Sequence, residues 1–192
     1  MMAALACGRS KTGGFSSGEL ELLNGTDSIM RVLTIEDSLD NVVLRAASHD
    51  FSLEELMSDE FKKLERMMIA TVTHPSQDGV GIAGPQVGLN RRIVAVQRFD
   101  KEGEPFEVYA NVRIVWLSDS LSCGPEGCLS VPDRRGNVLR SQQIVIEYAD
   151  LASLSHSCDD IPMARDTVSG FTAVIFQHEI DHLEGVLYID RL

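Results

Sequence analysis

The chain has 192 residues, of which 44% are hydrophobic and 24% are charged, and its formal net charge is −12 at pH 7. This length is enough for one domain with a single buried core, whereas the acidic charge argues against stable nucleic-acid binding through phosphate contacts. No apolar run approaches the roughly 20 residues that a membrane-spanning helix needs, so the sequence predicts no membrane span.

Residues 1–27 differ in composition from the rest and are expected to be a flexible leader. Residues 1–7 are apolar, and residues 11–27 are rich in Gly, Ser and Thr, a composition typical of flexible segments. The run that ends at Cys7 also looks like the end of a bacterial lipoprotein signal, although it is short and has no basic region before it. The four cysteines form no C-x-x-C pair, so a reduced compartment is the default. We therefore expect a cytoplasmic protein, with a lipid anchor on Cys7 as the alternative.

Helical signals follow in the next segment. Ser52 and Glu55 form a capping-box pattern that opens a short turn. A longer helix is expected from Ser58 or Asp59 to about Thr73, because acids stand in its first turn and Pro75 follows its end. Its apolar residues recur on one face, which we interpret as core packing: Phe61, Leu64, Met67, Met68 and Val72.

Four strands are predicted from β-branched or alternating residues, at 92–97, 107–111, 112–117 and 143–148. A last helix is expected from near Gly170 to about Leu183, with Gly185 as its C′ residue. Several short strands before one late helix indicate an α+β fold rather than a doubly wound sheet.

The last predicted helix carries the clearest chemical signal, His178-Glu179-Ile180-Asp181-His182. Positions four apart share a helix face, so His178 and His182 can bind one metal ion. Glu179 can then reach a metal-bound water as a general base. A surface helix that happens to carry these residues is the alternative, but the pattern is rare by chance in a chain with five histidines.

A catalytic metal needs a third protein ligand, and the best candidate is Cys128 in residues 125–132. Its thiolate would be a strong ligand, because a metal lowers the thiol pKa. The alternative is that Cys128 is a small buried residue, the commonest fate of a free cysteine. A third segment, residues 79–88, contains four glycines and Gln86, whose amide could donate to an oxygen.

In this order and spacing, the three segments resemble the motifs of the peptide deformylase family, G-x-G-x-A-A-x-Q, E-G-C-L-S and Q-H-E-x-D-H. Here they stand at 79–86, 126–130 and 177–182. The resemblance extends from about Met30, with residues 31–35 similar to the family's opening strand, to Ile189. It departs at Gly84, a mild change from alanine that would loosen the loop, and at 152–166, a segment longer than the family's usual hairpin. The implied fold has antiparallel sheets packed around a central C-terminal helix that carries the H-E-x-x-H motif, plus one N-terminal helix, in a catalytic domain spanning 28–192.

The resemblance implies removal of the formyl group from the N-terminal formyl-methionine of new bacterial polypeptides. Cys128, His178 and His182 would hold one divalent metal ion, ferrous iron in the cell, with zinc, nickel or cobalt as alternatives. A metal-bound hydroxide would attack, and Glu179 would be the general base. The oxyanion would be stabilised by two donors, Gln86 and the backbone N–H of Leu129. The implied partners are the formyl-methionyl peptide and, transiently, the ribosome.

The substrate would lie beside this metal. Gly81 and Gly127 could let the peptide backbone lie alongside as an added strand. The helix residues that share the face of His178 would line an apolar slot for methionine, together with Val80, unless they are simply core: Phe171, Val174 and Ile175. Glu126 and Arg140 would form a supporting ion pair, as the family's equivalents do, and Arg135 would help to hold the substrate.

Two other classes remain as alternatives. A metalloprotease of the H-E-x-x-H type would take its third ligand from beyond the helix, where only ten residues remain after His182. A non-catalytic binder could retain the fold, but every ligand, the general base and the oxyanion donor are present.

Overall fold

The computed structural model describes residues 14–25, 28–156 and 159–192. Within these residues, four α-helices precede the first strand: α1 Ser17–Asn24, α2 Ser38–Leu44, α3 Leu53–Leu56 and α4 Asp59–Val72. The capping box of α3, the bounds of α4 and its buried face agree with the sequence predictions. The expected lipid anchor on Cys7 concerns a residue outside the described part.

Three antiparallel sheets follow. The first contains β1 Gly81–Ala83, β2 Ile93–Gln97 and β3 Phe106–Ala110 in that order, with the 3-10 turn η1 Gly84–Val87 after β1. The second contains β4 Arg113–Leu117, β7 Gln143–Ala149 and β8 Met163–Ser169, with the 3-10 turn η2 Leu154–His156 between β7 and β8. The third is a pair, β5 Leu121–Cys128 and β6 Val131–Ser141.

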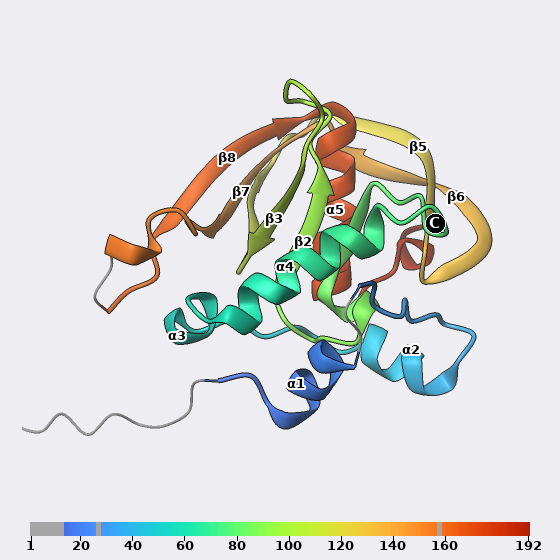
Figure 1. Ribbon diagram of the computed structural model, residues 1–192. Helices are drawn as coiled ribbons and strands as arrows, with labels where there is room; N and C mark the ends of the chain where they lie inside the picture. The colour runs from blue at the N-terminus through green and yellow to red at the C-terminus, as the bar shows by residue number, and fades with distance from the viewer. Residues whose placement is uncertain (1–13, 26–27, 157–158) are drawn as a thin grey trace, which may run out of the picture.

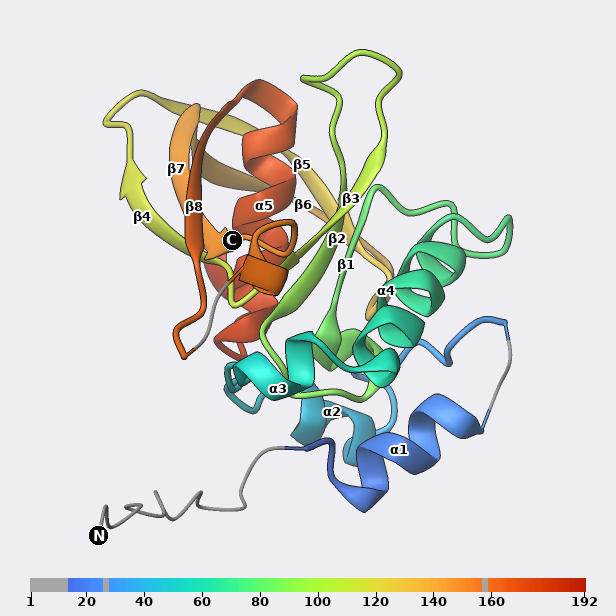
Figure 2. The same cartoon turned by 60° about the vertical axis from the view of Figure 1, so that its left-hand side comes forward.

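The last helix, α5 Gly170–Leu183, stands between these sheets (Figures 1 and 2) and contacts strands of all three. Most of its residues from Thr172 onward are buried, as expected for a helix surrounded by other elements. The helix is followed by Gly185, which has a left-handed φ of 71°. This position requires glycine, because a Cβ there would also lie 2.4 Å from the carbonyl oxygen of Arg45. The 3-10 turn η3 Tyr188–Arg191 closes the described chain. The α+β architecture around a central C-terminal helix is therefore as expected.

Three apolar clusters hold the elements together. The first joins α1, α3 and α4 to the first sheet, and the second joins α5 to the first and second sheets. The third and smallest joins β6 to the end of the chain around η3. Burial of apolar side chains is the main stabilising term in such packing. Because α5 belongs to the core, the functional side chains that it carries have rigid backbone positions.

Three expectations about the N-terminal part need correction. Residues 31–35 are not a strand; this stretch instead forms isolated backbone hydrogen bonds, from Leu33 N to the Gln86 carbonyl oxygen and from Ile35 N to the Ser130 carbonyl oxygen. The described residues contain more than the one N-terminal helix expected. The expected flexible leader is helical between Ser17 and Asn24, because Ser16 and Glu19 form a capping box and Leu23 is buried in the core.

None of the described helices is long and apolar enough to cross a membrane.

Candidate metal centre and substrate cleft

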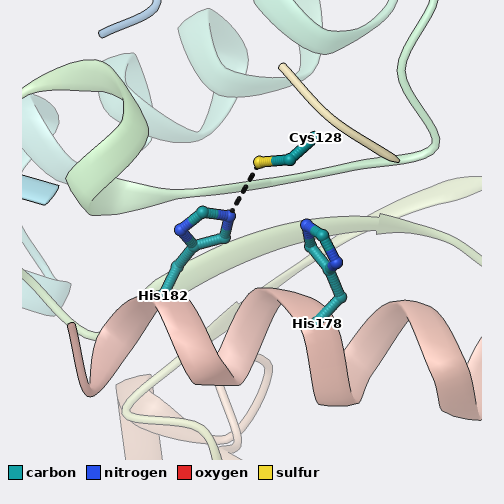
Figure 3. A group of neighbouring side chains, drawn as sticks. All are labelled: Cys128, His178 and His182. Atoms are coloured by element: carbon teal, nitrogen blue, oxygen red, sulfur yellow. Dashed lines mark hydrogen bonds between the residues drawn. The ribbon is translucent and has the colours of Figure 1, made fainter. Parts of the chain in front are cut away.

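Helix α5 presents His178 and His182 one turn apart on the same side. Their ring centroids lie 5.2 Å apart, and both rings face Cys128 across a narrow gap (Figure 3). The helix is held in register by Gln177, whose side chain exchanges two hydrogen bonds with the backbone of Ser141, at 2.9 and 3.0 Å. This amide anchor was not among the predicted site residues, although it lies within the same motif.

Cys128 reaches the site because β5 ends there in a tight turn. Cys128 pairs directly with Val131, whereas Glu126 pairs with Gly136, so β6 carries extra residues between these two pairs. Such a bulge re-aims side chains, and here it lies next to Cys128. The described part of the chain places the donor atoms of Cys128, His178 and His182 within 4.8 Å of one another, with Cys128 Sγ 3.2 Å from His182 Nε2.

Glu126 and Arg140 fix the orientation of the His178 ring through its Nδ1 atom. His178 Nδ1 donates to Glu126 at 2.8 Å, which leaves Nε2 as the free ligand atom. Arg140 donates to both oxygens of Glu126, at 2.8 and 3.0 Å, so the expected ion pair is present. Arg140 also bonds Asp181 at 2.6 Å, and Asp181 in turn accepts from Arg191. The roles of Asp181 and Arg191 escape sequence reasoning, because only the folded chain brings η3 back to α5.

The charges of this cluster favour a cation. Burial alone would lower the pKa of His178, but the neighbouring Cys128 and Glu126 raise it to about 10. Glu126 is also buried, yet His178 and Arg140 lower its pKa to about 2. Burial lowers the pKa of His182 and keeps its imidazole neutral. A cysteine sulfur and two imidazole nitrogens, with the Glu126 carboxylate beside one of them, together suit a divalent metal such as zinc or ferrous iron.

Glu179 lies beside this cluster and is 4% exposed. Burial raises its pKa to about 7, and its Oε2 has no hydrogen-bond partner among the described residues. Gly81 makes this position possible, because a Cβ on Gly81 would lie 2.5 Å from Glu179 Oε1 and 2.8 Å from Ile175. A carboxylate with a pKa near neutrality can both accept and return a proton.

Gln86 points its amide at the same site from η1. Its Oε1 accepts from the backbone N–H of Ala83 at 2.8 Å, which directs Nε2 toward Cys128 Sγ at 3.5 Å and Ser130 Oγ at 3.3 Å. Gln86 is 1% exposed. The oriented amide can donate to an oxygen of a bound substrate. Ser130 belongs to the E-G-C-L-S motif, but the motif alone does not predict its contact with Gln86.

A cavity of about 860 Å³ opens over these groups. The predicted ligand, catalytic and substrate residues that line it are Val80, Gly81, Gln86, Gly127, Cys128, Leu129, Phe171, Val174, Ile175, His178 and Glu179. His182 is fully buried below it. Ile175 forms the buried end of the apolar wall, whereas Phe171 is 56% exposed at the rim and packs on Phe99, 5.2 Å away. Arg135 lies at the cavity mouth beside Arg134, which sequence reasoning did not select.

Residues 29–192 match the family model described as Polypeptide deformylase. The chain belongs to the peptide deformylase family. It is 38% identical over 161 residues to a peptide deformylase of Leptospira biflexa serovar Patoc, covering 80% of this chain and 84% of that one.

Solved deformylase structures share the fold. A class I type b peptide deformylase from Acinetobacter baumannii with K3U bound has a TM-score of 0.73 at 32% identity, over 85% of this chain and 99% of that chain. The same kind of enzyme with Met-Ala-Ser bound has a TM-score of 0.71 at 31% identity, over 87% and 100% of the two chains. The deformylase described here is therefore an enzyme of this family with the family's fold.

Proposed function

We propose that this deformylase removes the formyl group from the N-terminal formyl-methionine of newly made polypeptides at a metal centre held by Cys128, His178 and His182. One observation carries the proposal: three ligand atoms of the right chemistry converge within 4.8 Å, beside a buried Glu179 whose pKa is about 7. Ferrous iron is the ion that we expect in the cell, and zinc, nickel or cobalt can satisfy the same ligands.

A divalent ion bound there would supply a Lewis acid that lowers the pKa of a coordinated water toward neutrality. Glu179 would accept the proton of the attacking water and return it to the amine nitrogen as the bond between the formyl carbon and that nitrogen breaks. The products are then formate and a free amino terminus. Because Glu179 is almost fully buried but lines the cavity, it would exchange its proton with the bound substrate rather than with bulk water.

Gln86 and the backbone N–H of Leu129 would donate to the formyl oxygen as it gains negative charge. Losing one such donor typically raises the barrier by about 3 kcal/mol. The open edge of β1 and the exposed Gly127 flank the cavity, so the peptide backbone could add as a strand beside Gly81. The apolar wall formed by Val80, Val174 and Ile175 would hold the methionine side chain, with Phe171 at its rim.

The expected setting follows from this substrate. New polypeptides emerge from the ribosome, so we propose that the enzyme acts in the cytoplasm and contacts the ribosome transiently.

The direct test is formate release from formyl-Met-Ala-Ser, compared with formyl-Asp-Ala-Ser and formyl-Gly-Ala-Ser under anaerobic conditions. Burial of the methionine side chain contributes about 1.5–3 kcal/mol. The formyl-Met peptide should therefore exceed the others by at least about tenfold in kcat/KM, since tenfold corresponds to about 1.4 kcal/mol. Equal values would contradict the assigned apolar wall. Cleavage of internal peptide bonds without formate would support a metalloprotease instead.

A further inference from the structure

Helix α1 lies before the residues that the deformylase family model matches, which begin at residue 29. Leu22 of this helix nevertheless contacts Gly88, which ends the turn η1 that carries Gln86. The helix itself lies at the base of the molecule (Figure 2). We infer that α1 positions Gln86 for catalysis and so acts on the reaction from outside the cleft. This inference rests on the role in oxyanion stabilisation proposed above for Gln86.

The first contact lies at the end of η1. Gly88 caps this turn with a left-handed φ of 87°, and a Cβ there would lie 2.8 Å from Leu22 Cδ1. The Leu22 side chain is therefore in direct contact with the backbone of Gly88. A side chain at position 88 would need both an unfavourable backbone conformation and a shift of the Leu22 side chain.

The second contact is an ion pair with Arg91, three residues after Gly88. Arg91 Nε donates to Glu19 of α1 at 2.6 Å, and the same guanidinium bonds Glu55. Its cationic group also lies 5.8 Å from the ring centre of Phe15 and 5.1 Å from that of Phe51. With only 13% of its side chain exposed, this Arg91 pair is better shielded than a surface salt bridge, whose contribution is small.

The backbone of Arg91 in turn packs against Gly84, the first residue of η1. A Cβ on Gly84 would lie 2.6 Å from the carbonyl oxygen of Arg91 and 2.7 Å from that of Leu89. The returning chain therefore packs against the first residue of η1 more closely than any side chain would permit. The family motif has alanine at this position. The close packing around Gly84 is therefore found where this chain differs from the family motif.

On its inner side the same turn supports the catalytic amide. Gln86 is bonded through its side chain to Ala83 N at 2.8 Å and through its carbonyl to Leu33 N at 2.8 Å. The turn thus lies between α1 outside and the cleft inside. A small shift of its backbone would move Nε2 of Gln86 relative to the substrate oxygen, and the strength of such donation depends on placement.

Leu22→Ala in the full-length chain tests the inference, with Leu20→Ala as the matched control. Both leucines are half-buried on α1 and pack on the same core, but Leu22 is the one that contacts the Gly88 position. We expect similar decreases in Tm for the two variants. Leu22→Ala should lower kcat by at least about threefold, short of the roughly 100-fold effect of losing an oxyanion donor, with KM and bound metal unchanged. Leu20→Ala should retain the parent kcat.

A double-variant cycle separates positioning from general destabilisation. In a Gln86→Ala background, Leu22→Ala should have no further effect on kcat, because the group on which it acts is absent. Equal kcat in Leu22→Ala and Leu20→Ala, or an undiminished effect of Leu22→Ala without Gln86, would overturn the inference. A parent enzyme that releases no formate would instead overturn the proposed function, so the two failures are distinguishable.

Discussion

The side chain of Glu179 packs directly against Gly81, beside the candidate metal ligands. The carboxylate is buried there because position 81 has no side chain, and burial raises its pKa to about 7. A single residue on β1 therefore determines whether Glu179 can lie at the site with a pKa suited to accepting and returning a proton near neutral pH.

Glu179→Gln separates proton transfer from metal binding. Glutamine keeps the shape and hydrogen-bonding ability of glutamate but cannot accept a proton near neutral pH. The variant should fold and bind metal like the parent, while kcat falls by the roughly 10²–10⁴-fold typical of a lost general base. Steady-state formate assays and metal analysis on one sample measure both quantities. Loss of the metal would instead identify Glu179 as a ligand, and parent-like turnover would require another base.

Gly84→Ala restores the residue that the family motif has, yet we expect it to be harmful here. The sequence suggests that glycine loosens the loop, whereas the structure leaves no room for a Cβ against the carbonyl oxygens of Leu89 and Arg91. Overpacking of this kind costs about 1–3 kcal/mol of stability. Urea unfolding should show this loss, together with a lower kcat. A Gly84→Ala variant as stable as the parent would contradict the packing described for η1.

At the scale of elements, sequence patterns predicted α4, α5 and the strands with regular alternation. They did not predict β5 and β6, because Gly124, Pro125 and Gly127 interrupt β5, and the extra residues of β6 remove its alternation near the cleft. Helix α1 was also missed, although the Ser16 and Glu19 capping box was a usable signal. Its docking depends on Arg91, which is distant in sequence.

The first and second sheets are joined by Arg98, which follows β2. Its guanidinium is almost fully buried and bonds Asp100 at 2.7 and 2.8 Å, Asp166 of β8 at 2.9 Å, and the Tyr109 hydroxyl of β3. Sequence alone does not reveal this connection, because its partners come from three different segments.

Arg98→Met should reveal this connection through its pH dependence. Arg98 lowers the pKa of Asp100, so the ionised carboxylate stabilises the fold above its unfolded pKa of about 4 and loses that contribution as pH falls. The stability difference between parent and variant should therefore be largest at pH 7 and smaller at pH 3. Urea unfolding of the metal-free proteins at both pH values measures it. A difference that does not change with pH would show that Arg98 acts by packing alone.

At the scale of the whole molecule, three short motifs in the right order were enough to predict the family, because the chemistry needs those residue types together. The structure brings the predicted ligand, base and amide donor to one cleft. Asp181, Arg191 and Ser130 form hydrogen bonds that support these groups. Motif spacing could not predict these bonds, because they depend on how η3 and the β5–β6 turn fold back onto α5.

Stepwise return of metal to the chelated enzyme tests whether the ion held by Cys128, His178 and His182 is required for turnover. Ferrous iron is added anaerobically while formate release from formyl-Met-Ala-Ser and bound metal per chain are measured together. Activity should rise in proportion to bound metal and reach its maximum at about one ion per chain, as for a catalytic metal with three protein ligands. Cys123→Ala, which changes an exposed cysteine of the same strand, should behave like the parent, whereas Cys128→Ala should neither bind the ion nor release formate. Full activity in the metal-free enzyme would show that the reaction needs no metal, and one tightly bound ion in Cys128→Ala would show that Cys128 is not a ligand.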